Sequence, residues 1–95
     1  SGRAELIVTV NDSMANMANL MHGGIIYTLC DACAYAALSS VLDYNTEALT
    51  HDIQVSVMRS AKLGEKVVFN AEVVKQGKRV CFMAVKVYVN DKIIA

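Results

Sequence analysis

The stretch NLMHGGIIYTLCDACAYAALSS, residues 19–40, decides the fold. From about Gly24 to Leu42 no β-type alternation occurs, and apolar residues recur around every side of a helical turn. This pattern predicts one long helix enclosed on most sides, with the single charged residue Asp31 inside it. The apolar positions of this helix are Ile25, Ile26, Leu29, Cys30, Cys33, Ala34, Ala36, Ala37 and Val41.

The chain on either side of this helix alternates with period two, which predicts strands. One strand is expected from Arg3 to Val10, and after a break at 43–45 further strands are expected at 53–58, 67–74, 80–89 and from Ile93 onward. The order strand, helix, antiparallel strands predicts an α+β domain with one sheet on one helix. A single sheet covers one side of a helix, so we expect a curved sheet that wraps it and a second subunit that closes the rest.

The composition indicates a packed domain that recognises a small molecule. The 95 residues, taken as one domain over 1–95, are 55% hydrophobic, and nine basic side chains balance nine acidic ones. This balance argues against nucleic acid as a partner. No apolar run reaches the roughly 18 residues of a membrane span, so we expect a soluble protein without membrane insertion. A binding pocket must then provide specificity.

The cysteines and the chain ends bear on the compartment. Three cysteines, an odd number, without a secretory leader favour a reducing compartment, the cytoplasm, with the mitochondrion as the alternative. Cys30 and Cys33 form a C-x-x-C in mid-helix, where core packing is expected rather than redox or zinc chemistry. Ser1-Gly2 is typical of tag removal and the chain stops inside an apolar stretch, so we expect both ends to be cut.

Three residues in the opening stretch can do chemistry. Gly23 and Gly24 directly before the helix would place bare N–H groups at its positive end, which stabilises a polarised carbonyl oxygen. The alternative is a plain tight turn. The position of Asp31 inside an apolar helix needs an explanation, because burial of an unpaired carboxylate in an apolar site costs several kcal/mol. It could accept a hydrogen bond from Tyr27 or Tyr35, one helical turn away, or face solvent.

Within one chain the two ends of such a site cannot meet. His22 and Asp31 are nine residues apart, which is about 13 Å along a helix. If Asp31 serves the same reaction centre as the Gly23 N–H, the second half must come from another copy, with two antiparallel helices about a two-fold axis. This predicts two identical sites per dimer, each built from both subunits.

Asn16, then His22-Gly23-Gly24, then Asp31, nine residues after the histidine, form the pattern N-x5-HGG-x6-D. This pattern resembles that of the hotdog-fold acyl-CoA thioesterases of the PaaI-like group. The stretch SAKLGEKVVFNAEVVKQGKRVCF, residues 60–82, is similar to the corresponding strands of an animal member, so that the resemblance covers residues 14–95. Many relatives carry Gly where Asn19 stands, and Asn can adopt the same backbone shape.

The resemblance implies a hotdog fold and hydrolysis of a fatty-acyl or aryl-acyl thioester to free acid and coenzyme A, with no cofactor. It implies that the Gly23 N–H polarises the carbonyl and that Asn16 orients the carbonyl or the water. Asp31 of the facing subunit would be general base or nucleophile, and Thr50 would hold the water against it. His22 would order the loop and orient the carbonyl.

Substrate recognition is expected from backbone, basic and apolar groups. Gly24 lets a bulky ligand approach closely, and basic residues at strand ends and turns could meet the phosphates of coenzyme A or simply form a solvated rim. These are Arg59, Lys62, Lys75, Lys78 and Arg79, while Met14, Met17 and Met21 suit an apolar chain. We expect a homodimer or a dimer of dimers. The competing functions are a non-catalytic acyl-CoA-binding or sensing module and a hydratase for enoyl thioesters.

Overall fold

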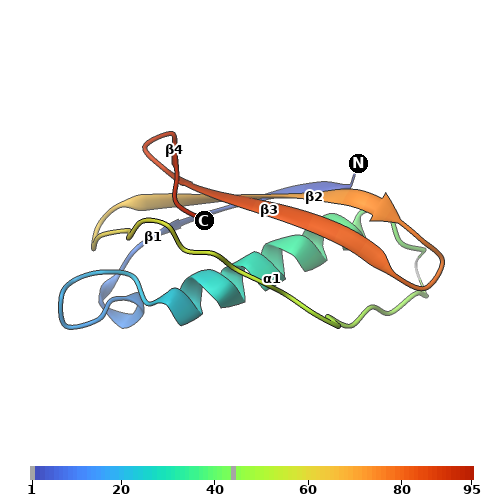
Figure 1. Ribbon diagram of the computed structural model, residues 1–95, viewed down its shortest axis with the longest axis horizontal. Helices are drawn as coiled ribbons and strands as arrows, with labels where there is room; N and C mark the ends of the chain where they lie inside the picture. The colour runs from blue at the N-terminus through green and yellow to red at the C-terminus, as the bar shows by residue number, and fades with distance from the viewer. Residues whose placement is uncertain (1, 44) are drawn as a thin grey trace.

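In the computed structural model, which describes residues 2–43 and 45–95, one long helix packs on one face of a four-stranded antiparallel sheet (Figure 1). The sheet order β1-β2-β3-β4 follows the chain. The expected α+β architecture, a helix held against a curved sheet, is confirmed. In chain order the elements are β1 (Arg3–Thr9), the 3₁₀ helix η1 (Asp12–Met14), α1 (Gly23–Ser39), β2 (Lys66–Gln76), β3 (Cys81–Val89) and β4 (Lys92–Ile93).

The strands form where apolar residues alternate, and one set of each alternation faces the core. Leu6 pairs with Phe69 and Val8 with Val67 across β1 and β2, and Phe69 and Val67 are completely buried. The β2–β3 hairpin closes with the Gly77 N–H donating to the Val80 carbonyl at 3.0 Å. The turn from β3 to β4 uses Asn90 and Asp91 with positive φ of 50° and 65°, the backbone shape of a tight hairpin.

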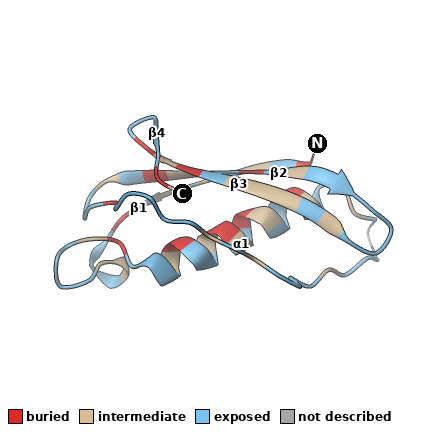
Figure 2. Cartoon of the chain, viewed as in Figure 1, coloured by how far each residue is buried: buried red, intermediate tan, exposed pale blue. Residues whose placement is uncertain are grey.

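One face of α1 packs on the sheet and the other lies open. Its buried residues Ile26, Cys30, Cys33 and Ala37 recur every three or four positions, as one helical face requires. The opposite face is exposed along its length (Figure 2). In the single chain the sheet covers one side of the helix, as expected, and closure of the other side by a second subunit stays a prediction.

The thiols of Cys30 and Cys33 belong to the core, as expected. Cys30, Cys33 and Cys81 are free thiols. Burial, with a smaller contribution from Cys33, raises the pKa of the Cys30 thiol to about 11. The Cys33 sulfur lies 3.5 Å from the carbonyl oxygens of Ala4 and Phe69, and burial raises its pKa as well. Both helix thiols are thus protonated packing groups at neutral pH.

The predicted strand at 53–58 does not join the sheet. Residues 47–57 run back alongside α1 without regular secondary structure (Figure 1). Ile53 and Val55 still pack against the core. Backbone hydrogen bonds to the sheet region come from the end of the segment, where the N–H groups of Met58 and Arg59 donate to the Ile94 carbonyl at 2.7 and 3.3 Å. Because β4 is two residues long, this segment has no full strand beside it with which to pair.

The remaining boundaries differ slightly from those expected. The helix begins at Gly23 and ends at Ser39, three residues before the predicted Leu42. The predicted break at 43–45 includes Tyr44 and the predicted tag remnant includes Ser1, and both of these residues lie outside the described part of the chain. Across the described residues, no helix is both long and apolar enough to cross a membrane.

Candidate active site

The carboxylate of Asp31 is held by the hydroxyl of Thr50. Asp31 is half-buried in the third turn of α1, and the Thr50 Oγ1 donates a hydrogen bond to its Oδ1 at 2.6 Å. Thr50 belongs to the segment 47–57, which runs back alongside α1 (Figure 1). The alternative partners Tyr27 and Tyr35 make no hydrogen bond to Asp31 in the described chain. Of the predicted catalytic residues, these two meet directly.

One carboxylate oxygen remains available. Nothing in the described residues donates to the Asp31 Oδ2, since the Thr50 contact uses Oδ1. An ionised carboxylate accepts several hydrogen bonds, so Oδ2 can accept one from a water molecule beside the Thr50 hydroxyl. The arrangement provides a fixed base with one satisfied and one open oxygen.

The start of α1 presents two N–H groups without partners. The first backbone bonds of the helix run from the Ile25 and Ile26 N–H groups to the His22 carbonyl at 3.1 and 3.3 Å. The Gly23 and Gly24 N–H groups precede them and find no acceptor among the described residues. Such groups carry the positive end of the helix dipole. An anion or a carbonyl oxygen can bind there.

The two glycines are not needed for a tight turn, which was the alternative reading. Neither Gly23 nor Gly24 is among the residues with positive φ, and a Cβ at either position would meet nothing within 4 Å. Backbone strain and packing inside the chain therefore do not call for glycine here. The absence of a side chain at Gly23 and Gly24 therefore matters for a ligand or a second protein chain that approaches the helix start from outside.

Asn16 organises the loop before the helix and keeps a free donor. Its Oδ1 accepts hydrogen bonds from the N–H groups of Ala18 and Leu20 at 2.9 and 3.2 Å. Asn19, at the position where Gly is common in the resembled group, has a φ of 61°, so the expected left-handed backbone is confirmed. The Asn16 Nδ2 makes no hydrogen bond to the described residues. Any contact of Asn16 with substrate must use this nitrogen.

His22 contributes through its backbone. Its N–H donates to the Met14 carbonyl at 2.9 Å, and its own carbonyl accepts the first hydrogen bonds of α1. The imidazole is exposed and makes no side-chain cap to the helix. The role of ordering the loop thus rests on backbone groups, and the ring is free to meet a ligand.

The two halves of the site are separated within one chain. Gly23 and Asp31 stand eight residues apart on a straight helix, about 12 Å. The exposed face of α1 between and beyond them is uncharged apart from Asp31. It presents the tyrosines Tyr27 and Tyr35, with exposed fractions of 44% and 50%. A single copy therefore holds the Asp31 carboxylate in one place and the helix end with unpaired N–H groups in another.

The basic residues fall into two groups at opposite ends of the sheet. Lys62 forms an isolated backbone β-bridge with Leu20, beside the start of α1, and Arg59 lies three residues earlier in the chain. Lys78 and Arg79 lie in the β2–β3 turn, next to Lys75. The strand β2 between them begins at Lys66 and ends at Gln76, roughly 33 Å apart. The predicted coenzyme A contacts do not form one cluster in a single chain.

The methionines expected near an apolar pocket differ in exposure. Met21 is buried and Met14 is half-buried against the core. Met17, next to Asn16, and Leu49, next to Thr50, are 104% and 95% exposed. Leu49 was not predicted, although an apolar residue adjoining a candidate catalytic hydroxyl was visible in the sequence.

Comparison with known proteins shows the family to which this chain belongs. The Thioesterase superfamily pattern matches residues 18–94. Acyl-coenzyme A thioesterase 13 from Homo sapiens is 32% identical over 84 residues, covering 88% of this chain and 59% of that protein. The mouse protein of that name is also 32% identical, over 76 residues, covering 80% of this chain and 54% of its own length. The chain thus spans little more than half the length of these curated relatives.

Solved structures show the same architecture. Zebra fish thioesterase superfamily member 2 superimposes with a TM-score of 0.89 at 27% identity, covering 98% of this chain and 68% of that one. A hypothetical thioesterase from Streptococcus pneumoniae, solved with coenzyme A, gives a TM-score of 0.90 at 23% identity over 98% and 71%. Since a family pattern spans most of the sequence and the hotdog architecture recurs in these structures, the chain belongs to the thioesterase superfamily.

Proposed function

We propose that the protein hydrolyses acyl-CoA thioesters to a free acid and coenzyme A, and that its active unit is a homodimer. The observation that carries the proposal is the 2.6 Å hydrogen bond from Thr50 to Asp31. It prepares one carboxylate for general base catalysis on a helix whose N-terminus carries unpaired N–H groups. Membership of the thioesterase superfamily supports the reaction class.

The dimer follows from the open face of α1. Two such helices packed antiparallel about a two-fold axis bring the partner's Gly23 to Asp31, and the axis then passes at Tyr27, midway between them. The exposed, uncharged surface around Tyr27 suits burial against its own copy. Residues 47–57, which lack a strand partner, would gain one from the same segment of the second copy. Each dimer holds two identical sites.

In the proposed reaction, water lies between the Asp31 Oδ2 and the Thr50 hydroxyl. Asp31 accepts a proton while the water oxygen attacks the thioester carbonyl carbon. The partner's Gly23 N–H, assisted by the Asn16 side-chain nitrogen, donates to the developing oxyanion. The C–S bond then breaks, and the coenzyme A thiolate takes the proton from Asp31. A positioned base contributes about 10²–10⁴ in rate and one oxyanion donor about 10²–10³.

The antiparallel pairing also explains the two basic groups. It places the partner's Arg59 and Lys62, which accompany its helix start, on the same side of the axis as this chain's Lys78 and Arg79. The phosphates of coenzyme A could contact either group. Met17 and Leu49 offer exposed apolar surface to a fatty-acyl or aryl-acyl chain. Coenzyme A enters as part of the substrate, and no step uses another cofactor.

The first test is a screen of acyl-CoA and aryl-CoA esters, followed by the loss of thioester absorbance. Asp31→Asn should lower kcat about 10²–10⁴-fold, and Thr50→Val about 5–100-fold, since it leaves the carboxylate without its donor. Asp43→Asn and Thr46→Val are matched controls at exposed positions and should retain full activity. Full turnover by an intact Asp31→Asn dimer would reject the proposal.

The same screen separates the competing functions. Tight binding of acyl-CoA esters by calorimetry with no hydrolysis of any ester would favour a binding or sensing module. A single turnover in ¹⁸O-labelled water distinguishes the two roles of Asp31. As general base it leaves ¹⁸O in the product acid, whereas as nucleophile it forms an anhydride and the label enters its own carboxyl group when water attacks there.

A further inference from the structure

The end of the β2–β3 hairpin, residues 74–82 (the hairpin end), concentrates positive charge in a chain whose total charge is balanced. Between Glu72 and Asp91 the sequence has no acidic residue, and the hairpin end alone has three basic ones, Lys75, Lys78 and Arg79. All three are exposed, and their side chains form no ion pair or hydrogen bond with the residues that the structure describes. The hairpin end therefore carries a local positive field that the net charge of the whole chain conceals.

Exposed apolar side chains lie beside these cations. Residues 74–80 are all exposed (Figure 2), and Val74, Val80 and Phe82 have exposed fractions of 63%, 58% and 58%. The register shifts between Val73 and Lys75, and Lys75 pairs with Phe82. Val74 is thus the extra residue of a β-bulge, and Val74 and Lys75 together oppose Phe82. Contiguous exposed apolar surface of this kind marks an interaction site.

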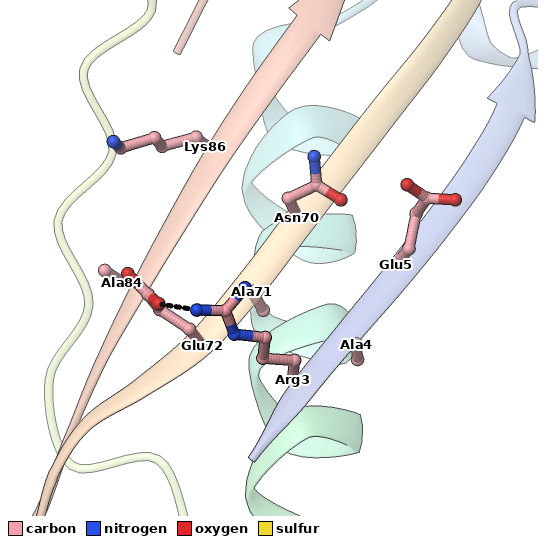
Figure 3. A pocket seen from close by; sticks show the side chains of 8 residues that line it. All are labelled: Arg3, Ala4, Glu5, Asn70, Ala71, Glu72, Ala84 and Lys86. Atoms are coloured by element: carbon pink, nitrogen blue, oxygen red, sulfur yellow. Dashed lines mark ion pairs between the residues drawn. The ribbon is translucent and has the colours of Figure 1, made fainter. Parts of the chain in front are cut away.

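The hairpin end lies open on the outer face of the sheet, opposite α1. Along β3 the outer row runs through Lys86, Ala84 and Phe82, because Val87 and Val89 face inward and are buried. Figure 3 shows Ala84 and Lys86 with α1 behind the sheet. A dimer formed through α1 leaves this surface uncovered.

The acidic side chains of the outer face do not neutralise the hairpin end. Glu72, the nearest acid along β2, forms an ion pair with Arg3 at 3.6 Å (Figure 3). Glu5 pairs with Asn70, which lies further from the turn. The positive field of the hairpin end therefore stays available to a partner outside the chain.

The tip of the hairpin is held by its own backbone. The Gly77 N–H donates to the Val80 carbonyl at 3.0 Å, and a Cβ at Gly77 would lie 2.6 Å from that oxygen. The turn therefore needs glycine at this position, and it presents Lys78 and Arg79 between the two bonded residues. A turn that is already fixed loses little conformational entropy when its side chains bind a surface.

We propose that the hairpin end binds the surface of an anionic lipid bilayer. Its apolar side chains enter the headgroup region while its cations contact the charged lipid groups, and the hairpin lies on the bilayer without spanning it. An anionic bilayer offers a negative surface and apolar depth together, which matches the pairing of Lys75 with Val74 and Phe82. Each basic side chain near such a surface strengthens binding about fivefold, so three give roughly 100-fold.

Tryptophan fluorescence provides the first test. The chain has no tryptophan, so Phe82→Trp introduces a single probe at the hairpin end. Ile7→Trp is the matched control, on the same face of the sheet, 50% exposed and remote from the turn. With vesicles of phosphatidylcholine and phosphatidylserine, the emission of Phe82→Trp should shift to shorter wavelength and that of Ile7→Trp should not. Vesicles of phosphatidylcholine alone should shift neither.

Vesicle co-sedimentation measures the strength of binding. We expect the wild type to partition into phosphatidylserine-containing vesicles about 10–100-fold more strongly than into phosphatidylcholine vesicles, and less strongly as salt is raised. Val74→Ser with Phe82→Ser should weaken this partition at least about fivefold, whereas Ile7→Ser with Ile93→Ser should leave it unchanged. Because Lys78 and Arg79 are candidate contacts of coenzyme A, no variant replaces them. Circular dichroism checks that each variant is folded.

Three results would each overturn the inference: a wild type that does not bind phosphatidylserine vesicles, equal emission shifts for the two tryptophan variants, or a folded Val74→Ser, Phe82→Ser variant that binds as tightly as the wild type. Binding to soluble polyglutamate without binding to vesicles would assign the charge to an acidic protein and would also overturn it. Thioester hydrolysis without vesicles is measured separately. Loss of vesicle binding leaves the proposed function standing, and absence of hydrolysis leaves the bilayer surface standing.

Discussion

Replacing Gly23 with proline removes one backbone donor from the candidate oxyanion site and little else. Gly23 is the first residue of α1, the position where proline fits best because its N–H has no partner in the helix. His22 already has φ −60° and ψ 136°, which suits a residue before proline. A side chain at position 23 meets nothing within 4 Å. The variant should fold with unchanged or slightly higher stability, by up to about 1 kcal/mol.

The expected loss of activity follows from the missing hydrogen bond. Removing one oxyanion donor lowers kcat about 10²–10³-fold, equivalent to about 3–4 kcal/mol of transition-state stabilisation. KM should change little. Gly23→Ala is the matched control, because it adds a side chain at the same place but keeps the N–H. The ratio of kcat for Gly23→Pro to kcat for Gly23→Ala separates the loss of the N–H donor from the effect of the added side chain.

Mixing variants tests where the donor acts. Gly23→Pro and Asp31→Asn should each be inactive alone. In a mixed dimer one site carries both substitutions, and the other combines an intact Asp31 with the partner's intact Gly23. Random assortment makes half of the dimers mixed, so about a quarter of the wild-type activity should return. Co-expression with two tags and the thioester absorbance assay measure it. If verified mixed dimers stay inactive, or if Gly23→Pro hydrolyses at the wild-type rate, the shared site is refuted.

Three further predictions concern the fold. Phe69→Ala empties a completely buried position and should lower the free energy of unfolding by about 3–5 kcal/mol in urea titrations; a loss below 1 kcal/mol would contradict its place in the core. Asn19→Ala should cost about 1 kcal/mol because φ is 61° there, whereas Asn19→Gly should be nearly neutral, and equal effects would argue against the left-handed backbone. Burial raises the pKa of Cys30 from 9.0 to about 11, so the unfolded chain loses this proton first and stability should fall from pH 9 to 11; Cys30→Ala should flatten that decline in thermal unfolding.

Much of the fold could be predicted from local patterns. In β1, β2 and β3, successive side chains point to opposite faces of the sheet, so the residues that face the core recur at every second position. This period is visible in the local sequence and does not depend on distant parts of the chain. The helix was likewise predictable, from about Gly24 to Leu42 against the observed Gly23–Ser39, because its apolar residues recur at helical spacing. The roles of His22, Gly23 and Asp31 are expectations drawn from the residue types, their spacing and the family resemblance, and they stay predictions.

The tertiary structure decided what depends on neighbours distant in sequence. Residues 53–58 have a strand pattern, yet they join no sheet because a strand needs another strand edge and β4 ends too soon. The partner of Asp31 is Thr50 rather than a nearby tyrosine, because the returning segment brings its hydroxyl to 2.6 Å. The separation of Arg59 and Lys62 from Lys78 and Arg79 likewise follows from the length of the sheet. Periodicity in the sequence specifies local geometry and facing direction, whereas the pairing of distant segments is set only when the whole chain packs.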